Sequence, residues 1–169
     1  MRGDIARLDR VIEAILVLSA PPTAGSARDV VNVADAARTA APPGVDVRAP
    51  DEALVAADAR LVDLALANLI ENAEKHAGGA RAIEVRREGD AVRVVVVDAG
   101  PGVPDAELEK MFDRYWRGAA DERGNGLGLA FVRVVAERYG GRASARQRGD
   151  VAGLEVGFTL APLLAWAES

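Results

Sequence analysis

Two asparagines one helical turn apart, Asn68 and Asn72, are the residues whose types and spacing first suggest chemistry. With Lys75 and His76 they fall on one face of a helical pattern. The opposite face carries an apolar stripe made of Leu66, Leu69, Ile70, Ala73 and Ala77. Asparagine is a poor residue inside a helix, because its amide competes for backbone hydrogen bonds. Two amides followed by an ammonium and an imidazole therefore predict a face that meets a ligand carrying phosphates and a metal ion.

A carboxylate followed by two glycines stands just after a strongly apolar run that ends at Val97. Asp98 could accept a hydrogen bond from an exocyclic amine, such as the N6 group of adenine. Gly100 and Gly102 let the backbone turn sharply and let a planar ligand approach closely. A plain Asp-Gly turn with no ligand is the alternative interpretation.

A second glycine-rich segment, with Gly124, Gly126 and Gly128, precedes a helical pattern. Free N–H groups and the helix dipole favour a phosphate at such a place, and a flexible loop is the alternative. Two familiar phosphate-binding motifs do not fit. A Walker A loop needs a Gly-Lys-Ser/Thr sequence, and the dinucleotide fingerprint needs a glycine where Leu129 stands.

The composition describes one domain's worth of chain and excludes several classes of function. The chain has 169 residues, a formal net charge of −5 and no cysteine. The acidic balance and the lack of a long Lys/Arg run argue against nucleic-acid binding. Without cysteine there are no disulfides and no thiolate zinc sites. No apolar run approaches the roughly 20 residues that span a bilayer, so we expect a cytoplasmic chain with no direct membrane insertion.

The first part of the chain is predicted to be a helix from Asp4 to Ser19, followed by a linker over residues 21–27. Its apolar residues are spaced for packing on another helix or on the domain's own core. After the linker we expect the following elements: a strand at Val30–Val33, a helix from Asp35 to Ala41, and a strand at Val45–Arg48 with Leu54–Ala56 as its hairpin partner.

The helix that holds the asparagines is predicted to begin after Asp58 as N-cap and to end at Gly78-Gly79. Two strands follow, over residues 82–87 and 91–97, joined by a tight turn at Gly89-Asp90. Residues 105–126 lack a convincing long helix, which is typical of a functional lid or a disordered insert. The second glycine-rich segment then opens a helix through Tyr139, and two strands follow over residues 142–147 and 154–160.

The order of these motifs resembles one family. Asn68–His76 resembles its N box, Asp98–Gly102 its G1 box, Phe112–Gly118 its F box, and Gly124–Leu129 its G2 box. Together they look like the catalytic ATP-binding domain of a bacterial sensor histidine kinase, in the superfamily that includes gyrase, heat-shock chaperone ATPases and MutL. The resemblance covers roughly residues 28 to 161.

The resemblance implies an α/β two-layer sandwich of the Bergerat type, with a mixed and mostly antiparallel sheet under three helices and an ATP lid. It also implies a domain organisation. Residues 1–20 would be the remnant of a dimerisation helix, 21–27 a linker, 28–162 the catalytic ATP-binding domain and 163–169 a tail. A homodimer through residues 4–19 is then expected.

The resemblance also assigns roles around ATP and Mg²⁺. Asn72 would ligate the metal, Asn68 would support the metal and phosphates, and Lys75 would be a point charge on the phosphates. His76 would stack on the adenine. The remaining assignments are Asp98 to the adenine amine, Gly100 and Gly102 to the base, and Gly124, Gly126, Leu127 and Gly128 to the phosphates and the lid.

Three residues are candidates for the transfer step. Arg114 and Arg117 could stabilise the γ-phosphate, and Glu71 could polarise an acceptor histidine, although a solvated helix carboxylate is an equal alternative. Hydrolytic members of the superfamily carry a glutamate where this chain has Asn68, and an amide is no base at neutral pH. ATP should therefore be held for transfer to a protein.

The function implied is donation of the γ-phosphate to a histidine on the dimerisation domain of a parent kinase, for relay to a response regulator. The single histidine, His76, lies inside the N box, so the acceptor must lie elsewhere, and the chain is expected to be a piece of a larger receptor in the inner or plasma membrane. A serine kinase of the anti-sigma-factor type and a non-catalytic docking module are the alternatives.

Overall fold

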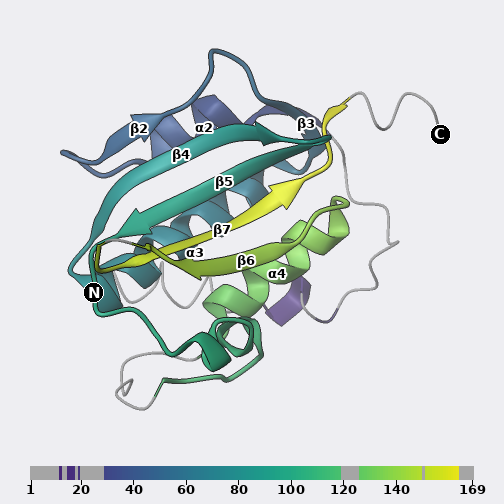
Figure 1. Ribbon diagram of the computed structural model, residues 1–169. Coiled ribbons are helices and arrows are strands. Elements are labelled where there is room, and N and C mark those ends of the chain that lie inside the picture. The colour runs from purple at the N-terminus through teal and green to yellow at the C-terminus, as the bar shows by residue number, and fades with distance from the viewer. Residues whose placement is uncertain are drawn as a thin grey trace, which may run out of the picture.

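The computed structural model describes residue 12, residues 15–17, residue 19, and residues 29–118, 126–149 and 151–163. Within this part of the chain, one five-stranded sheet carries three helices on one face (Figure 1). The strand order is β2-β4-β5-β7-β6, and a separate two-stranded sheet pairs β1 with β3. The predicted two-layer α/β fold is confirmed.

The strands make a mixed sheet because only the β2–β4 pair is parallel, while the β4–β5, β5–β7 and β6–β7 pairs are antiparallel. The strands span these residues: β1 Asp29–Asn32, β2 Asp46–Arg48, β3 Leu54–Ala57, β4 Ala80–Glu88, β5 Ala91–Asp98, β6 Ala143–Gln147 and β7 Leu154–Leu160. β5 lies at the centre of the sheet and is buried from Val92 to Asp98. This burial is what its unbroken valine run predicts.

Three helices cover one face of the sheet: α2 (Val33–Ala40), α3 (Ala59–Ala77) and α4 (Gly128–Arg138). The longest, α3, begins as predicted with the Asp58 side chain accepting from the Arg60 N–H. It ends at Gly78, whose φ of 70° is the left-handed conformation that glycine tolerates best. Leu66, Leu69 and Ala73 are buried on its inner side.

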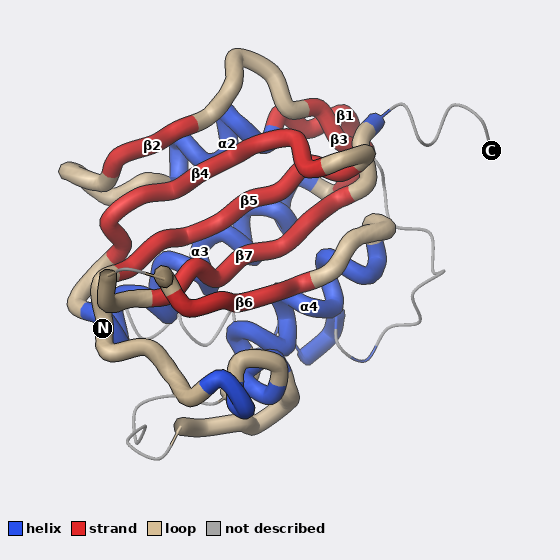
Figure 2. The backbone as a smooth tube through the Cα atoms, in the orientation of Figure 1, coloured by secondary structure: helices blue, strands red, loops and turns tan. Residues whose placement is uncertain are grey.

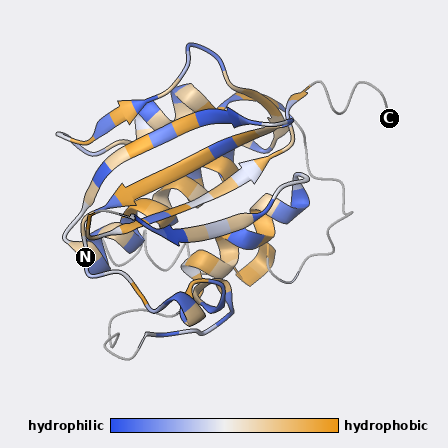
Figure 3. Cartoon of the chain, viewed as in Figure 1, coloured by the Kyte–Doolittle hydropathy of each residue, from blue (hydrophilic) through white to orange (hydrophobic). Residues whose placement is uncertain are grey.

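The main core lies between the helices and the sheet. Val92, Val94 and Val96 of β5 join the buried residues of α3 and α4 in one cluster. The other side chains of β5 face the open side of the sheet, where Val95 and Val97 form a small second cluster with Ala82. Figure 3 shows β5 largely in the hydrophobic colours, as expected for a strand buried on both faces.

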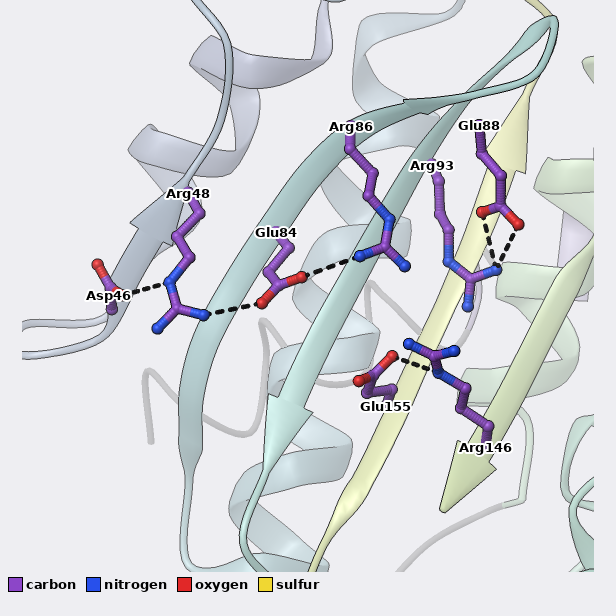
Figure 4. Close-up of polar contacts among 8 residues, drawn as sticks. All are labelled: Asp46, Arg48, Glu84, Arg86, Glu88, Arg93, Arg146 and Glu155. Carbon is purple, nitrogen blue, oxygen red and sulfur yellow. Dashed lines mark hydrogen bonds and ion pairs between the residues drawn. The ribbon is translucent and has the colours of Figure 1, made fainter. Parts of the chain in front are cut away.

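Charged side chains of β2, β4, β5, β6 and β7 also lie on the open face of the sheet (Figure 4). They form three groups of ion pairs: Asp46–Arg48–Glu84–Arg86, Glu88–Arg93 and Arg146–Glu155. Most of these pairs have at least one exposed partner, and such pairs stabilise a fold only slightly. Their long aliphatic stems contribute more, since they shield the apolar strand surface beneath them from water.

The predicted hairpin between Val45–Arg48 and Leu54–Ala56 is wrong. β2 pairs in parallel with β4, and β3 pairs with β1. Side chains at the two ends of α2, Asn32 at its N-cap and Arg38 in its last turn, redirect the connection between the two strands. The Asn32 amide accepts from the Ala53 N–H and donates to the Asp51 carbonyl, while Arg38 donates to the carbonyls of Ala49 and Pro50.

Two helix starts also differ from the prediction. α2 begins at Val33 with Asn32 as its N-cap, whose side chain accepts from the Ala34 N–H, so Asp35 is a first-turn residue. α4 begins at Gly128 and does not include Gly126. Between β5 and α4 lie two single-turn 3₁₀ helices, η1 (Asp105–Glu107) and η2 (Lys110–Phe112).

The described residues before β1 are helical and lie beside α4 (Figure 1). Val17 packs against the main core, and the Arg138 Nη2 atom donates to its carbonyl at 3.3 Å. The predicted linker over residues 21–27, most of the predicted helix and the tail after residue 163 lie outside the described residues. In the described part of the chain, no helix is long and apolar enough to cross a membrane.

Candidate nucleotide-binding site

The ends of α3 and β5 lie together at one end of the sheet. α3 ends at Ala77, β4 begins three residues later at Ala80, and Ala80 pairs with Asp98 at the end of β5. Figure 2 shows the loop after β5 continuing from this end toward the start of α4. A cavity of about 400 Å³ lies here, a size typical of small-molecule sites. It is lined by Asn72, Lys75, His76, Ala77, Asp98, Gly100, Pro101, Gly102, Val103, Pro104, Glu107, Met111, Trp116, Gly118 and Leu154.

The last two turns of α3 bring Asn72, Lys75 and His76 to this cavity. The Asn72 amide has no hydrogen-bond partner within the described part of the chain, so its oxygen is available to a ligand. The Lys75 Nζ atom lies 2.7 Å from the Glu71 Oε1 atom. The predicted polar stripe of α3 therefore reaches the cavity with an amide, an imidazole and a paired ammonium.

Asn68 does not line the cavity but lies where α3 approaches the start of α4. Its Nδ2 atom donates to the Leu64 carbonyl at 2.9 Å, one turn earlier in α3. Its Oδ1 atom faces the first residue of α4, where a Cβ built on Gly128 would lie 2.8 Å from it. The small size of Gly128 thus lets the N-terminal end of α4 approach the amide face of α3 closely.

Asp98 is the buried carboxylate of the site, with 4% of its surface exposed. Its Oδ1 atom accepts two backbone N–H groups, from Gly100 and from Leu154, each at 3.0 Å. The Oδ2 atom has no partner among the residues that the structure describes. The two backbone bonds orient the carboxylate and leave one oxygen for a donor in the cavity.

Gly100 and Gly102, the two glycines after Asp98, are each required for a different structural reason. A Cβ at Gly100 would lie 2.6 Å from the Ala77 Cβ atom, so this glycine lets the loop pack against the end of α3. Gly102 has a φ of 75°, in the left-handed region that side chains rarely adopt. The loop therefore follows a path along the cavity that residues with a side chain would obstruct.

The predicted lid region is closed at its base by backbone contacts. The Tyr115 N–H donates to the Gly126 carbonyl at 2.8 Å, and a Cβ at Gly126 would lie 2.6 Å from the Tyr115 Cα atom. Leu127 is buried at the start of α4. Gly126, Leu127 and Gly128 do not line the cavity, and Gly124 lies outside the described residues.

Arg114 and Arg117 are exposed and do not line the cavity. Glu71 does not line it either, although its partner Lys75 does. Asp113 forms an ion pair with Arg133 of α4 at 3.0 Å, which holds the segment that carries both arginines against that helix. The predicted phosphate-facing arginines therefore lie near the base of the lid.

The sequence did not predict several lining residues, among them Met111, Trp116 and Leu154. Trp116 lies in the F-box segment and Met111 lies next to it, so that motif could have indicated both as residues of the site. Leu154 has no such signal, because it reaches Asp98 only through the pairing of β5 with β7, across 56 positions of sequence.

Comparison with known proteins agrees with this geometry. Residues 57–162 match the family model described as "Histidine kinase-, DNA gyrase B-, and HSP90-like ATPase". The sensor protein SphS of Synechococcus elongatus is 31% identical, over 85% of this chain and 41% of its own length. The ATP-binding domain of PrrB from Mycobacterium tuberculosis superposes with a TM-score of 0.61 at 26% identity, covering 81% of this chain and 99% of that domain. Full-length ShkA superposes with a TM-score of 0.71 at 21% identity, covering 95% of this chain and 36% of the ShkA chain.

The chain therefore belongs to the histidine kinase, gyrase and HSP90-like ATPase family. Within that family it is the ATP-binding catalytic domain of a two-component sensor histidine kinase, as the order of the four motifs predicts. It spans between 11% and 41% of the lengths of eight curated relatives that it matches.

Proposed function

We propose that this domain binds ATP with Mg²⁺ and donates the γ-phosphate to a histidine on the dimerisation domain of its parent kinase. The phosphate then passes to an aspartate of a response regulator. The observation that carries the proposal is one cavity lined both by the buried Asp98 and by the polar end of α3, with Asn72, Lys75 and His76.

The base is placed at the Asp98 end of the cavity. Because Oδ1 is taken by two backbone N–H groups, Oδ2 is the oxygen that accepts the adenine N6 amine. Leu154 provides an apolar wall nearby, and its side chain is 5% exposed. An ionised carboxylate can only accept, so this arrangement favours a base with a donor and disfavours one with a carbonyl at the same position.

The residues present fit a magnesium ion that arrives with the nucleotide. Among the described residues there is no cluster of three or more histidine, aspartate or glutamate side chains that would hold a metal by itself. Mg²⁺ usually takes one or two protein oxygens together with phosphates and water. Asn72, which lines the cavity, would hold it through its amide oxygen, and the bound ion would neutralise charge on the phosphates.

The phosphates are placed between the end of α3 and the start of α4. Lys75 supplies a positive charge, and His76 lines the same wall. Gly126, Leu127 and Gly128 supply the backbone of the lid base, and Asn68 lies close to Gly128, where it would support the metal and phosphates. Gly124, Arg114 and Arg117 complete the proposed set, with the arginines as the groups that would stabilise the γ-phosphate during transfer.

The proposed reaction is transfer and not hydrolysis. The amide of Asn68 donates within its own helix and offers no base for an attacking water. Glu71 is a carboxylate of the same helix, and its ion pair with the cavity residue Lys75 makes it a candidate for orienting the acceptor histidine when Lys75 turns to the phosphates. Residues 4–19 are the proposed contact between two copies of the parent.

The first test is calorimetric titration with a non-hydrolysable ATP analogue, with and without Mg²⁺. We expect binding that Mg²⁺ strengthens, and Asn72→Ala should remove most of that Mg²⁺-dependent gain. Glu74→Ala, an exposed residue of the same helix outside the cavity, is the control and should keep it. Absence of binding by the wild type would refute the ATP site, and an unchanged Mg²⁺ response in Asn72→Ala would refute the metal role.

The second test adds a separate dimerisation domain that carries the acceptor histidine, together with ATP labelled in the γ-phosphate. We expect label on that domain in an acid-labile form, as phosphohistidine is. Acid-stable label would instead support the serine-kinase alternative, and no label despite nucleotide binding would support the docking alternative.

A further inference from the structure

The turn between β6 and β7 packs against the loop of residues 98–103, which we call the adenine loop. The Leu154 N–H donates to the Asp98 carboxylate at 3.0 Å. Just before it, a Cβ built on Gly153 would lie 2.1 Å from the Asp98 carbonyl oxygen. The turn therefore comes into direct backbone contact with the carboxylate residue of the site.

Arg148 fixes both the turn and the first residue of the adenine loop. Its Nη1 atom donates to the Asp98 carbonyl oxygen at 3.2 Å. Its backbone N–H donates to the Gly153 carbonyl at 3.1 Å, which closes the turn. Arg148 is half-buried and does not line the cavity, so it acts on the site only through Asp98 and the turn.

Gln147, the residue before Arg148, holds the other end of the adenine loop. Its Nε2 atom donates to the Val103 carbonyl oxygen. A Cβ built on Gly102 would lie only 2.5 Å from the Gln147 Oε1 atom, so the glycine lets this side chain approach closely. Two adjacent side chains of β6 and its turn thus hold the adenine loop at its two ends.

We propose that Arg148 and Gln147 are positioning residues that set the preference of this site for a base with an exocyclic amine. The inference rests on the proposed ATP function. Because only Oδ2 of Asp98 remains for the base, recognition depends on one hydrogen bond whose strength falls steeply when the angle or distance changes. Arg148 fixes the backbone that carries this carboxylate, and Gln147 fixes Gly102 and Val103, which also line the cavity.

The test compares the affinity for ATP with that for purine riboside triphosphate, which lacks the 6-amino group. The ratio of the two dissociation constants measures the amine preference. In Arg148→Met we expect this ratio to fall about fivefold, the fold-change that corresponds to roughly 1 kcal/mol, the net contribution of one hydrogen bond. Arg148→Lys keeps a donor and should restore most of the ratio. Gln147→Met should weaken both nucleotides and change the ratio less.

Arg146→Met is the matched control. Arg146 lies two residues earlier, on the open face of the sheet, where it pairs with Glu155 at 2.6 Å and does not touch the adenine loop. We expect the wild-type ratio in this variant. A wild-type ratio in Arg148→Met, at unchanged ATP binding, would overturn the inference alone. A wild type that binds neither nucleotide would overturn the proposed function and the inference together.

Discussion

Lys75 lines the proposed nucleotide cavity, and its ammonium group is paired with the Glu71 carboxylate. Phosphates bound there, as proposed, would have to compete with that carboxylate for the same positive charge. Both side chains are partly exposed, so the pair is worth at most about 1 kcal/mol and is weakened by salt. The pair should therefore lower the affinity for phosphates slightly without preventing their binding.

Glu71→Gln is expected to raise the affinity for ATP about two- to fivefold at low salt, because the free Lys75 ammonium then meets the phosphates without a competitor. The gain should shrink as salt is added. If Glu71 also orients the acceptor, the transfer rate falls while the affinity rises. Calorimetry and transfer assays separate the two effects. Glu74→Gln controls for the change in net charge, and weaker ATP binding by Glu71→Gln would contradict the competition.

Asp63 of α3 gives a dependence of stability on pH. Partial burial raises the pKa of its carboxyl above the ordinary value, because desolvation disfavours the charged form. The folded state then binds a proton more tightly than the unfolded state. Stability contributed at Asp63 is therefore lost as pH rises from the unfolded pKa through the raised folded pKa.

Asp63→Asn should remove this loss, so its stability relative to the wild type should improve as pH rises from about 4 toward neutrality. Denaturant unfolding measured at several pH values shows the trend. Asp90→Asn, in the exposed turn between β4 and β5, is the control. A difference between Asp63→Asn and wild type that stays constant across this pH range would refute the assignment.

At the scale of elements, β7 depends on a residue without a side chain. A Cβ at Gly157 would lie 2.1 Å from the Val94 carbonyl oxygen of β5, a contact with backbone that cannot be relieved by rotating a side chain. Close approach of β5 and β7 also shapes the candidate site, because this pairing brings Leu154 to Asp98.

Gly157→Ala should destabilise the domain by about 1–3 kcal/mol, since an added methyl group forces the two strands apart. Unfolding in denaturant measures this change. Gly149→Ala is the matched control, because nothing lies within 4 Å of the Cβ position at Gly149. Equal unfolding midpoints for the two variants would show that the strands yield without cost.

The elements themselves were largely predictable from local signals. The valine run of β5, the Asp58 cap and the Gly78 stop of α3 each acted as the sequence suggested. The β2–β3 hairpin was not predictable, since the two strands have hairpin-like spacing. It is prevented by Asn32 and Arg38, which lie earlier in the chain and bind the backbone of the connection. Local pattern cannot reveal a tertiary contact that overrides it.

In the candidate site, too, some residues were predictable from local sequence and others only from the tertiary structure. Its α3 and Asp98 components came from motifs whose chemistry is readable residue by residue. Leu154, Arg148 and Gln147 came only with the fold, because a loop is positioned by whichever strands the sheet places next to it. The predicted domain limits and the helix at residues 4–19 stay predictions, although Val17 packs on the core where that helix should end.

For the whole molecule, Tyr139 connects parts of the chain that are far apart in sequence. Its side chain is 1% exposed, and its hydroxyl oxygen accepts from the Asp58 N–H at 3.1 Å, at the start of α3. Its carbonyl oxygen accepts from the Ala161 N–H at 2.9 Å, just beyond β7. This residue at the end of α4 therefore holds together, at the side of the fold away from the cavity, the two elements whose other ends line it.

Tyr139→Phe should lower the free energy of unfolding by about 1–2 kcal/mol, because it leaves the partly buried Asp58 N–H without its acceptor. Nucleotide affinity should stay at the wild-type value, since Tyr139 does not line the cavity. Tyr115→Phe is the matched control: that side chain is 70% exposed, so losing its hydroxyl should change stability little. Denaturant unfolding measures the stability of both variants, and calorimetry measures their nucleotide affinity.

Equal stability of the two variants would mean that the Asp58 N–H donates to water instead. A fall in affinity with Tyr139→Phe would mean that this distant contact also shapes the cavity.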